Sequence, residues 1–524
     1  MRILSWKVLM MACFFTNLML AIIFLSNLED HCDCSHIQWK HSSYIASTLQ
    51  NHKDEIRNQN DTESQLSNKI AIVIRDFEFF ENDISETVKS ILSVLPSVKL
   101  FIISDQKPYP PLELPEIYKK NIQLLSLKPS LSIPSDSLNP FSVIDKEHIV
   151  VFPDSVRISN ISQILEMLIQ HYKDPNKIIA APVENTDSVC LTLNVSLRYW
   201  TIKYGKNAHY PNCDALEGTH VFLITKTLLL HLAFPFTQPF STSLYIQASL
   251  LNVKTQIASN ITFQRGKHLF SNHHAKWKHD LYQKQRRENM YHDFGIKKVI
   301  FPASKVEWYG CNKNTDRCFG TVINNMPEYL FQDRWTPPCC LEHLRQTARY
   351  VFSILEKCGV RYWLEGGSLL GAVRTGDIIP WDYDVDIGIY KEDIQKCEWL
   401  KNSVQQSIVD THGFVWEKAV EGDFIRVQFS QTNHLHIDIF PFYSRNGTMT
   451  KDTWFVDHKQ DTEFPEHFLK PLYQIKFVGM TVSAPNNYKE FLELKFGKGV
   501  IQKPEYPNPN VMKFSKRRTI SFIT

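Results

Sequence analysis

Three aspartates at alternate positions constrain the fold of this chain more than any other feature of its sequence. Asp382, Asp384 and Asp386 are separated only by Tyr383 and Val385. Side chains of a β-strand point to its two faces in turn, so a strand here would place the three carboxylates together and the intervening residues behind them. Clustered carboxylates repel one another unless a cation neutralises them, and hard oxygen ligands suit Mg²⁺. The pattern predicts a metal-binding strand; a structural calcium loop is the alternative.

Two neighbouring segments predict that this strand handles a phosphorylated substrate. Gly366, Gly367 and Ser368 precede the acids, and a glycine-rich turn lets the backbone approach a phosphate closely. Asp438 stands between two isoleucines in a second strand candidate at residues 436–440. A Gly-Gly-Ser turn, a strand with alternating acids and a further acid on a neighbouring strand resemble the nucleotidyltransferase fold.

The composition is that of an ordinary globular protein. The chain has 524 residues, a net charge of +3 and 43% hydrophobic residues, which excludes wholesale disorder and a dedicated nucleic-acid binder. Its length predicts about two to four domains. A basic, aromatic stretch at residues 273–298 is interpreted as a solvated helix between domains rather than as a nucleic-acid site.

The first 28 residues predict a membrane anchor. Arg2 and Lys7 precede an apolar run at residues 8–28, which would span about 31 Å as a helix. Because Glu29 and Asp30 follow, the positive-inside rule predicts a cytosolic tail at residues 1–7 and a lumenal body, a type II topology. A cleaved signal peptide is the alternative, but the run is long and no small-residue cleavage site follows it.

The rest of the chain has features expected in the lumen of the secretory pathway. Residues 29–68 are polar, lack an apolar period and predict a stem, in which Cys32 and Cys34 are candidates for an intermolecular disulfide. N-glycosylation sequons, in mild excess over chance, occur at Asn60, Asn160, Asn194, Asn260 and Asn446.

Residues 69–300 predict an α/β domain with a largely parallel sheet, because strand and helix patterns alternate. Strands are expected at Ile70–Ile74, Lys99–Ser104, His148–Phe152 and Ile178–Pro182, with helices near 84–95 and 161–172. The domain resembles the nucleotide-sugar half of a glycosyltransferase. Asp154 has no second acid to help it hold a diphosphate, so a structural or acceptor-orienting role is expected. Cys190 and Cys213 flank a short excursion and are candidates for a disulfide.

Four cysteines form a cluster within 30 residues: Cys311, Cys318, Cys339 and Cys340. Four thiolates can close a tetrahedral zinc shell. Two disulfides are the alternative, which an oxidising lumen favours, although adjacent cysteines pair awkwardly with two separate partners. The spacing alone leaves both open.

Several motifs together resemble the LicD-type phosphotransferase family. They are Leu-Glu-Gly-Gly-Ser-Leu-Leu-Gly at 364–371, Ile-Pro-Trp-Asp-Tyr-Asp-Val-Asp at 379–386, the segments 416–423, 434–438 and 484–488, and Trp-Thr-Pro-Pro-Cys-Cys at 335–340. With the anchor and the α/β domain, the resemblance covers nearly the whole chain. It implies a nucleotidyltransferase-like α+β catalytic domain at residues 301–524, including a zinc loop at 311–340.

The resemblance also implies an activity: transfer of ribitol 5-phosphate from CDP-ribitol to the O-mannosyl glycan of α-dystroglycan in the Golgi, which extends a ribitol-phosphate unit. It implies catalytic Mg²⁺ at the three aspartates and structural Zn²⁺ at the four cysteines. With the Gly-Gly-Ser turn, the expected donor contacts are Gly366, Gly367, Ser368, Arg374, Trp381, Tyr383, Val385, Lys459, Gln460, Gln502, Lys503 and Pro504. A diphosphate needs cations beyond the metal, which agrees with Arg374 and Lys459.

The expected chemistry is in-line attack by an acceptor hydroxyl on the phosphorus that carries ribitol, with CMP leaving. Asp438 or a member of the 382–386 set would position or deprotonate that hydroxyl, and the sequence does not decide which. His434 and His436 are weaker candidates, because a histidine near a strand is more often packed or hydrogen-bonded. We expect a homo-oligomer and no nucleic-acid partner. The alternative functions are a GT-A-type glycosyltransferase and a non-catalytic glycan-binding scaffold.

Overall fold

The computed structural model describes residues 59–129, 131, 139–186, 188–206, 210–317, 319–323, 326–455, 458 and 460–503. The predicted cytosolic tail, the anchor and most of the stem lie outside these residues, as do Cys32, Cys34, Cys318, Lys459 and Pro504. Among the helices that are described, none is both long and apolar enough to span a membrane.

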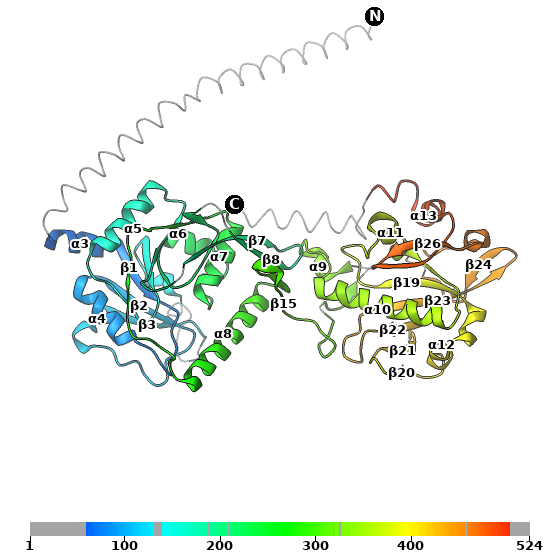
Figure 1. The fold of residues 1–524 in the computed structure, drawn as a ribbon, viewed down its shortest axis with the longest axis horizontal. Coiled ribbons are helices and arrows are strands. Elements are labelled where there is room, and N and C mark those ends of the chain that lie inside the picture. Colours follow the sequence, from blue (N-terminus) through cyan, green and yellow to red (C-terminus); the bar gives the residue numbers. More distant parts are fainter. Residues whose placement is uncertain are drawn as a thin grey trace, which may run out of the picture. The chain divides into compact units, whose positions relative to one another are not determined.

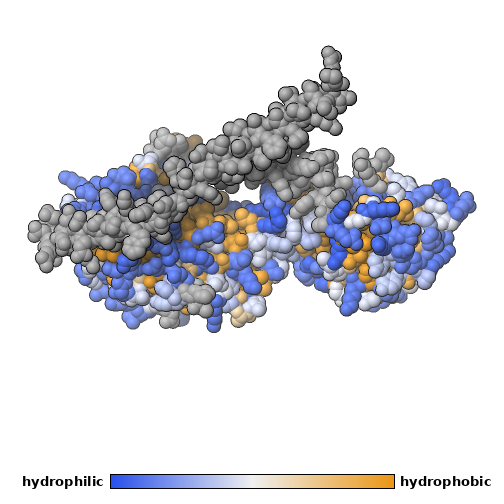
Figure 2. Space-filling model, turned by 90° about the horizontal axis from the view of Figure 1, so that it is seen from above, coloured by the Kyte–Doolittle hydropathy of each residue, from blue (hydrophilic) through white to orange (hydrophobic). Residues whose placement is uncertain are grey.

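The chain forms two compact units (Figure 1). The first comprises Met1–Thr186, Thr219–His231 and Ala258–Leu269; the second comprises Asp187–Gly218, Leu232–Ile257 and Phe270–Thr524. The domain limit expected at residue 300 stays a prediction, because the second unit draws segments from both sides of it. In the view of Figure 2, both hydrophilic and hydrophobic residues are visible on the described surface.

The first unit is built around a mixed sheet in which six strands follow the order β3-β2-β1-β4-β11-β6. Its strands are β1 (Ile70–Ile74), β2 (Lys99–Ser104), β3 (Ile122–Ser126), β4 (His148–Phe152), β6 (Ile178–Pro182) and β11 (His220–Thr225), with the short pair β5 (Val156–Arg157) and β13 (Gln264–Arg265). Its helices are α3 (Gln59–Lys69), α4 (Ile84–Val94), α5 (Ser162–Lys173) and α6 (Lys226–His231). The four strands and two helices expected here are confirmed.

The sheet is largely parallel, as predicted, with one strand running in the opposite direction. Strands β1, β2, β3 and β4 pair in parallel, but β11 lies between β4 and β6 and is antiparallel to both. Every residue of β1 is buried, and α4 contributes Ile84, Val88, Ile91 and Leu92 to the same core. The local pattern shows that β1 and α4 are buried, but it does not show that a strand some 70 residues later inserts beside β4.

The second unit begins with an antiparallel hairpin. The hairpin belongs to a sheet with the order β10-β7-β8-β14-β15. Its strands are β7 (Val189–Ser196), β8 (Thr201–Lys206), β10 (Ala215–Glu217), β14 (Lys298–Ile300) and β15 (Val306–Trp308). The unit also contains β9 (Asn212–Cys213), β12 (Thr255–Ile257), α7 (Phe240–Leu250) and α8 (His273–Asp293). The predicted disulfide between Cys190 and Cys213 is confirmed. Helix α8 is mostly exposed, as expected for the basic stretch.

The larger sheet of the second unit has the order β18-β19-β23-β22-β21-β20, with β24 and β25 continuing from β23. Its strands are β18 (Tyr362–Leu364), β19 (Val385–Tyr390), β20 (Ile408–Val409), β21 (Val415–Lys418), β22 (Ile425–Gln428), β23 (His436–Arg445), β24 (Thr448–Lys451) and β25 (Phe464–Pro465). Around it lie β16 (Val322–Ile323), β17 (Met326–Pro327), α9 (Glu328–Phe331), α10 (Pro338–Lys357), α11 (Gly366–Thr375), α12 (Glu398–Ser403), β26 (Tyr473–Phe477), β27 (Met480–Ala484) and α13 (Tyr488–Phe496). Helix α10 packs on β22 and β23, while α11 packs on β19 and α13.

Two local predictions are wrong in this region. The strand expected to carry all three acids begins only at Val385, so Asp382 and Asp384 lie in the segment that leads into β19. The expected Gly-Gly-Ser turn is the first turn of α11, which ends at Gly376 in the left-handed conformation. Helix hydrogen bonding therefore takes the place of a free loop.

Candidate active site

The structure brings the four predicted acids together. Asp386 on β19 lies directly opposite Asp438 on the parallel strand β23. Burial, and then Asp386, raises the pKa of Asp382 to about 7. Burial raises the pKa values of Asp384 and Asp386 well above the usual range, with Asp438 adding to both shifts. Neighbouring carboxylates add to these upward shifts, while Arg426 and Lys451 act in the opposite direction on Asp384 and Asp386 respectively.

Both residues between the acids pack against the hydrophobic core, as expected. The Val385 side chain is fully buried, so only its backbone can face a substrate. Tyr383 is half-buried against the same core, and its ring lies 5.9 Å from that of Phe319. Burial, followed by Asp384, raises the pKa of the Tyr383 hydroxyl.

The amino terminus of α11 lies against the acids because its first residues are small. A Cβ atom on Gly367 would lie 2.7 Å from an Asp382 oxygen, and Gly366 has a φ of +49°. The Ser368 hydroxyl accepts a hydrogen bond from the Asp386 backbone N–H at 2.9 Å. A helix amino terminus attracts anions through its free N–H groups, so this arrangement suits a phosphate bound beside the acids.

Asp438 already has a cationic partner. Arg426 on β22 stands opposite it in register and donates two hydrogen bonds to its carboxylate, at 2.8 and 3.0 Å. Arg426 also pairs with Glu421 at 3.0 Å. Because its charge is compensated, Asp438 is a poorer candidate for the base than a member of the 382–386 set.

The two histidines are also poor candidates for the base. Nε2 of His436 lies 3.8 Å from an Asp438 oxygen, and burial lowers the pKa of His436. His434 contacts the side chain of Gln428. Both side chains are thus held by protein groups.

Two buried ion pairs near the acids were missed by the sequence analysis. Glu365, which caps α11, pairs with Lys495 of α13 at 2.8 Å, and it also accepts a hydrogen bond from the Trp363 indole. Lys451, at the end of β24, pairs with Asp461 at 2.7 Å. The sequence signal for both is weak, because a lone lysine in a mixed segment is usually solvated.

Three cations near the acids already have carboxylate partners, and a fourth, Arg317, lies over the Phe319 ring. Arg426, Lys495 and Lys451 each have a carboxylate of their own. In the part of the chain that the structure describes, no lysine or arginine forms an ion pair with Asp382, Asp384 or Asp386. Clustered, half-buried carboxylates without an ion-pair partner fit a hard divalent cation such as Mg²⁺.

Three of the expected donor contacts, Arg374, Gln502 and Lys503, lie at the carboxyl end of α11, away from the acids' end of the helix. The guanidinium of Arg374 donates to the carbonyl oxygens of Val500, Ile501 and Lys503, so it lies against the segment that carries Gln502 and Lys503. Gln460 is half-buried. Lys459 and Pro504 stay predictions outside the described residues.

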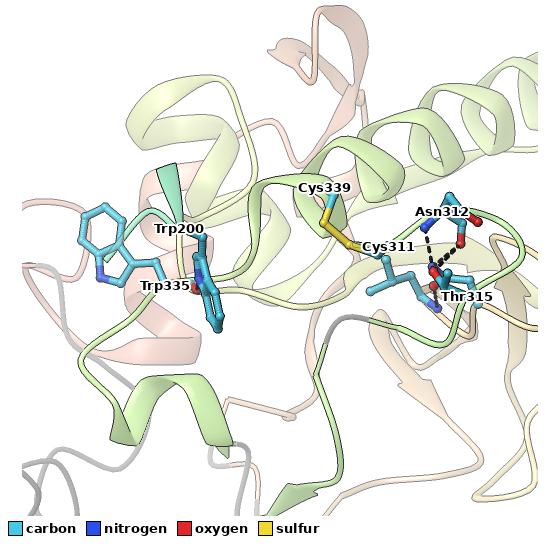
Figure 3. Close-up of a disulfide and its surroundings, with 8 residues drawn as sticks. Trp200, Cys311, Asn312, Thr315, Trp335 and Cys339 are labelled. Carbon is cyan, nitrogen blue, oxygen red and sulfur yellow. Dashed lines mark hydrogen bonds between the residues drawn. A yellow bond between two sulfur atoms is a disulfide. The ribbon is translucent and has the colours of Figure 1, made fainter. Parts of the chain in front are cut away.

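The cysteine cluster lies at the start of α10. Cys311 and Cys339 form a disulfide (Figure 3), and Cys340 is also disulfide-bonded. The sulfur atoms of these three residues lie within 4.8 Å of one another, so they could share one metal ion once their disulfides are reduced. Zinc at this loop stays a prediction.

A short path of contacts connects the cysteine cluster to the acids. Thr336, three residues before Cys339, donates through its hydroxyl to the Asp382 carbonyl at 2.6 Å and through its N–H to the Pro380 carbonyl at 3.0 Å. The Trp200 indole, also drawn in Figure 3, donates to the Trp335 carbonyl at 2.7 Å. A change in the cysteine loop is thus expected to shift the segment that carries Asp382.

The sequons that can be assessed lie on exposed residues: Asn160, Asn194, Asn260 and Asn446. Asn446 is at the tip of the hairpin between β23 and β24 and has a φ of +53°. The side chain of Asn60 lies outside the described region.

Comparison with known proteins gives two family matches. Residues 359–487 match "LicD/FKTN/FKRP, nucleotidyltransferase domain", and residues 57–302 match "Fukutin-related protein stem domain". The first match defines the class: a LicD-type nucleotidyltransferase domain, which agrees with the site built from Asp382, Asp384, Asp386 and the start of α11.

Relatives that align with most of the chain identify its family within this class. The chain is 48% identical over 447 residues to human "Ribitol 5-phosphate transferase FKRP", covering 85% of this chain and 89% of the relative. The mouse protein of the same name is 48% identical over 451 residues, covering 86% and 90%. Human "Ribitol-5-phosphate transferase FKTN" is 30% identical over 147 residues, covering 28% and 30%. The chain belongs to the fukutin-related protein family.

Proposed function

We propose that this protein transfers ribitol 5-phosphate from CDP-ribitol to the O-mannosyl glycan of α-dystroglycan. One observation carries the proposal: three half-buried carboxylates without an ion-pair partner among the described residues lie beside a helix amino terminus, inside a LicD-type domain. Such a site suits a metal-bound diphosphate. The choice of ribitol phosphate as the transferred group is supported by the names of relatives that are 48% identical over most of their length.

The proposed reaction is a single in-line displacement. An acceptor hydroxyl oxygen forms a bond to the phosphorus that carries ribitol, the bond from that phosphorus to the bridging oxygen breaks, and CMP leaves with the electron pair. The hydroxyl proton passes to a carboxylate of the 382–386 set, since Asp438 is neutralised by Arg426. The amino terminus of α11 binds phosphate oxygens through backbone N–H groups.

Mg²⁺ fits the three acids because they lack a counter-charge. Asp382, Asp384 and Asp386 would hold it, and when bound it would neutralise phosphate charge and the charge that develops on the leaving group. Removing divalent cations with EDTA should abolish transfer, and Mg²⁺ should restore it.

The test is a donor screen with the purified protein and a phosphorylated O-mannosyl glycopeptide. CDP-ribitol should give CMP and a product that is heavier by one ribitol phosphate, while UDP- and GDP-sugars should give none. Asp384→Asn is the matched control for the site. Transfer from a UDP-sugar would instead support a GT-A-type enzyme, and binding of the glycan without turnover of any donor would support a scaffold.

The cysteine cluster is proposed as a structural zinc site. What supports it is that Cys311, Cys339 and Cys340, all three disulfide-bonded in the structure, lie close enough to share one metal ion once reduced. Cys318→Ser should then destabilise the loop, because structural zinc contributes directly to folding. Metal analysis should find one zinc per chain. Peptide mapping that finds all four cysteines in disulfides, with no bound metal, would contradict the proposal.

The location is also proposed from the sequence. Residues 8–28 would anchor the protein in the Golgi membrane as a single-pass type II protein, with the described units in the lumen. Replacing residues 1–30 with a cleavable signal should release a glycosylated, secreted protein. A native protein that is soluble, with a mature amino terminus beyond Leu28, would contradict the anchor. A homo-oligomer stays a prediction that light scattering can test.

A further inference from the structure

Lys495 of α13 is a buried cation that the mechanism above does not use. It is 6% exposed, and its Nζ lies 2.8 Å from Oε2 of Glu365, which is 5% exposed. The rings of Phe464 and Phe491 have their centres 5.1 Å from the same Nζ. A carboxylate and two rings thus replace the water that an ammonium group loses on burial. Helix α13 packs against α11 (Figure 1), and the ion pair joins α13 to the residue that begins α11.

Glu365 precedes the first turn of α11, but its side chain does not cap the helix. It makes no hydrogen bond to the helix N–H groups. Its Oε1 instead accepts a hydrogen bond from the Trp363 indole at 2.9 Å, while Oε2 faces Lys495. Trp363 is fully buried, and a Cβ atom on Gly388 of β19 would lie only 2.3 Å from its ring. Both carboxylate oxygens are therefore held from the core side, and the carboxylate does not compete with an anion for the helix amino terminus.

The backbone of Glu365 connects this ion pair to the acids. The Glu365 N–H donates to the Asp386 carbonyl at 3.0 Å, and the Asp386 N–H donates to the Ser368 hydroxyl at 2.9 Å. A Cβ atom on Gly366 would lie 3.5 Å from Oδ2 of Asp386, so the start of α11 runs alongside this carboxylate. Burial and two aspartates raise the pKa of Asp386, and the Glu365 charge adds to the shift. The position of Glu365 is thus coupled directly to that of Asp386.

We propose that Lys495 is a positioning residue for the metal site. By holding the Glu365 carboxylate, it fixes the first turn of α11 against Asp382 and Asp386 in the geometry in which the acids share one divalent cation. Lys495 acts through Glu365 and does not touch the reacting atoms. The inference rests on the proposed function only in taking the acids as a metal site. Core stability alone does not require an ion pair here, because well-packed hydrophobic residues often replace such pairs without loss.

Charge alone predicts the opposite result, which makes the inference testable. Lys495→Met removes a positive charge near the acids and leaves Glu365 negative. A cation would then bind more tightly if only charge mattered. Loss of positioning instead takes the acids out of their shared geometry, so the cation should bind more weakly.

The test measures binding of Mn²⁺ alone to the full-length protein in detergent, by electron paramagnetic resonance of the free ion. Mn²⁺ suits carboxylate ligands, as Mg²⁺ does. Lys495→Met should raise the Kd about tenfold, the usual cost of losing a group that orients a metal ligand. Lys489→Met is the matched control: Lys489 is exposed on the same helix, so the Kd should stay within about twofold. Asp384→Asn identifies the site, because it should abolish this binding.

A double variant separates positioning from folding. Lys495→Met alone leaves the Glu365 carboxylate buried without its partner, which lowers stability. Adding Glu365→Gln removes that charge and keeps an acceptor for the Trp363 indole, so the melting temperature should recover toward that of the unmodified protein. Mn²⁺ binding should stay about tenfold weaker, because no ion pair then holds the start of α11. If Lys495→Met does not fold, the double variant decides.

Three results would overturn the positioning role: unchanged or tighter Mn²⁺ binding in Lys495→Met, full affinity in the double variant, or failure of both variants to fold. The proposed function is judged separately, since the binding assay contains no donor. Unmodified protein that binds Mn²⁺ at the acids but turns over no CDP-ribitol would sink the proposed function and leave this inference standing. Unmodified protein that binds no Mn²⁺ at the acids would overturn this inference.

Discussion

Each unit holds a cluster of aspartates that is at least partly shielded from water, but the two units treat the charges in opposite ways. In the first unit, Asp83 accepts hydrogen bonds from the Ser155 hydroxyl at 3.0 Å and the Lys267 N–H at 3.3 Å, and it pairs with Arg157. The Asp83 N–H donates a bifurcated hydrogen bond to the two carboxylate oxygens of Asp154, at 3.0 and 3.2 Å. In the second unit, Asp382, Asp384 and Asp386 have no such cation among the described residues.

The difference teaches how to tell a structural acid from a functional one. Burial raises the pKa of Asp154 to about 7, as it does that of Asp382, so this shift alone does not separate the two sites. The separating feature is the supply of partners. The closed cluster, Asp83 and Asp154, is held by Arg157 and backbone donors, whereas the open cluster, Asp382, Asp384 and Asp386, has no ion-pair partner among the described residues. We interpret the cluster of Asp83 and Asp154 as a structural network of hydrogen bonds and an ion pair.

The largest expected effect is on catalysis at the open cluster. Asp384→Asn or Asp386→Asn keeps the side-chain volume but removes a metal ligand, so transfer should fall by at least about 100-fold, or about 3 kcal/mol of barrier. The melting temperature without metal should hold or rise, because repulsion between carboxylates is relieved. Near-normal turnover of both variants at saturating Mg²⁺ would place the active site elsewhere.

An Asp→Asn substitution in the closed cluster should have the opposite effect: it should lower stability and leave catalysis unchanged. Asp83→Asn weakens the acceptor for Arg157 and leaves that guanidinium without its counter-charge. The free energy of unfolding should therefore fall by about 2–3 kcal/mol. Denaturant titration measures this, and kcat of the remaining folded protein should be unchanged. A 100-fold loss of kcat in a stable Asp83→Asn protein would erase the distinction between the clusters.

The pH dependence of the metal-free protein should sharpen the comparison. The folded pKa of Asp382 is about 7, above its value in an unfolded chain, so the folded state binds the proton more tightly. Stability in EDTA should thus decline as pH rises from about 4 to about 7, at roughly 1 kcal/mol per pH unit from this group. Asp382→Asn should flatten the slope, and so should saturating Mg²⁺. An identical slope in Asp382→Asn would contradict the assignment.

The smallest expected effect is at Tyr383. Its ring packs against the core and Phe319, so Tyr383→Phe, which keeps the ring, should lower transfer by less than about threefold. That is far less than the loss on removing a carboxylate. A steady-state assay at saturating Mg²⁺ measures it, with the melting temperature as control. A loss as large as that of Asp384→Asn would make Tyr383 part of the catalytic set.

The amino-acid sequence by itself determined the local helices and strands and the residue types that form the site. Buried β-branched runs defined β1, β2, β4 and β6, because short apolar runs between turns favour buried strands. The clustered acids and the glycines at 366 and 367 indicated metal and phosphate chemistry, because those residue types suit few other tasks at that spacing.

Only the tertiary structure decided which charges are compensated. The register that sets Asp386 opposite Asp438 and Arg426, the pairing of Lys495 with Glu365, and the insertion of β11 beside β4 join residues far apart in the chain. Local propensity does not encode such pairings, since each depends on how whole sheets and helices pack. The alternation of Asp382, Asp384 and Asp386 indicated the right cluster for a partly wrong reason. Two of the three precede the strand, and packing against α11 brings them together.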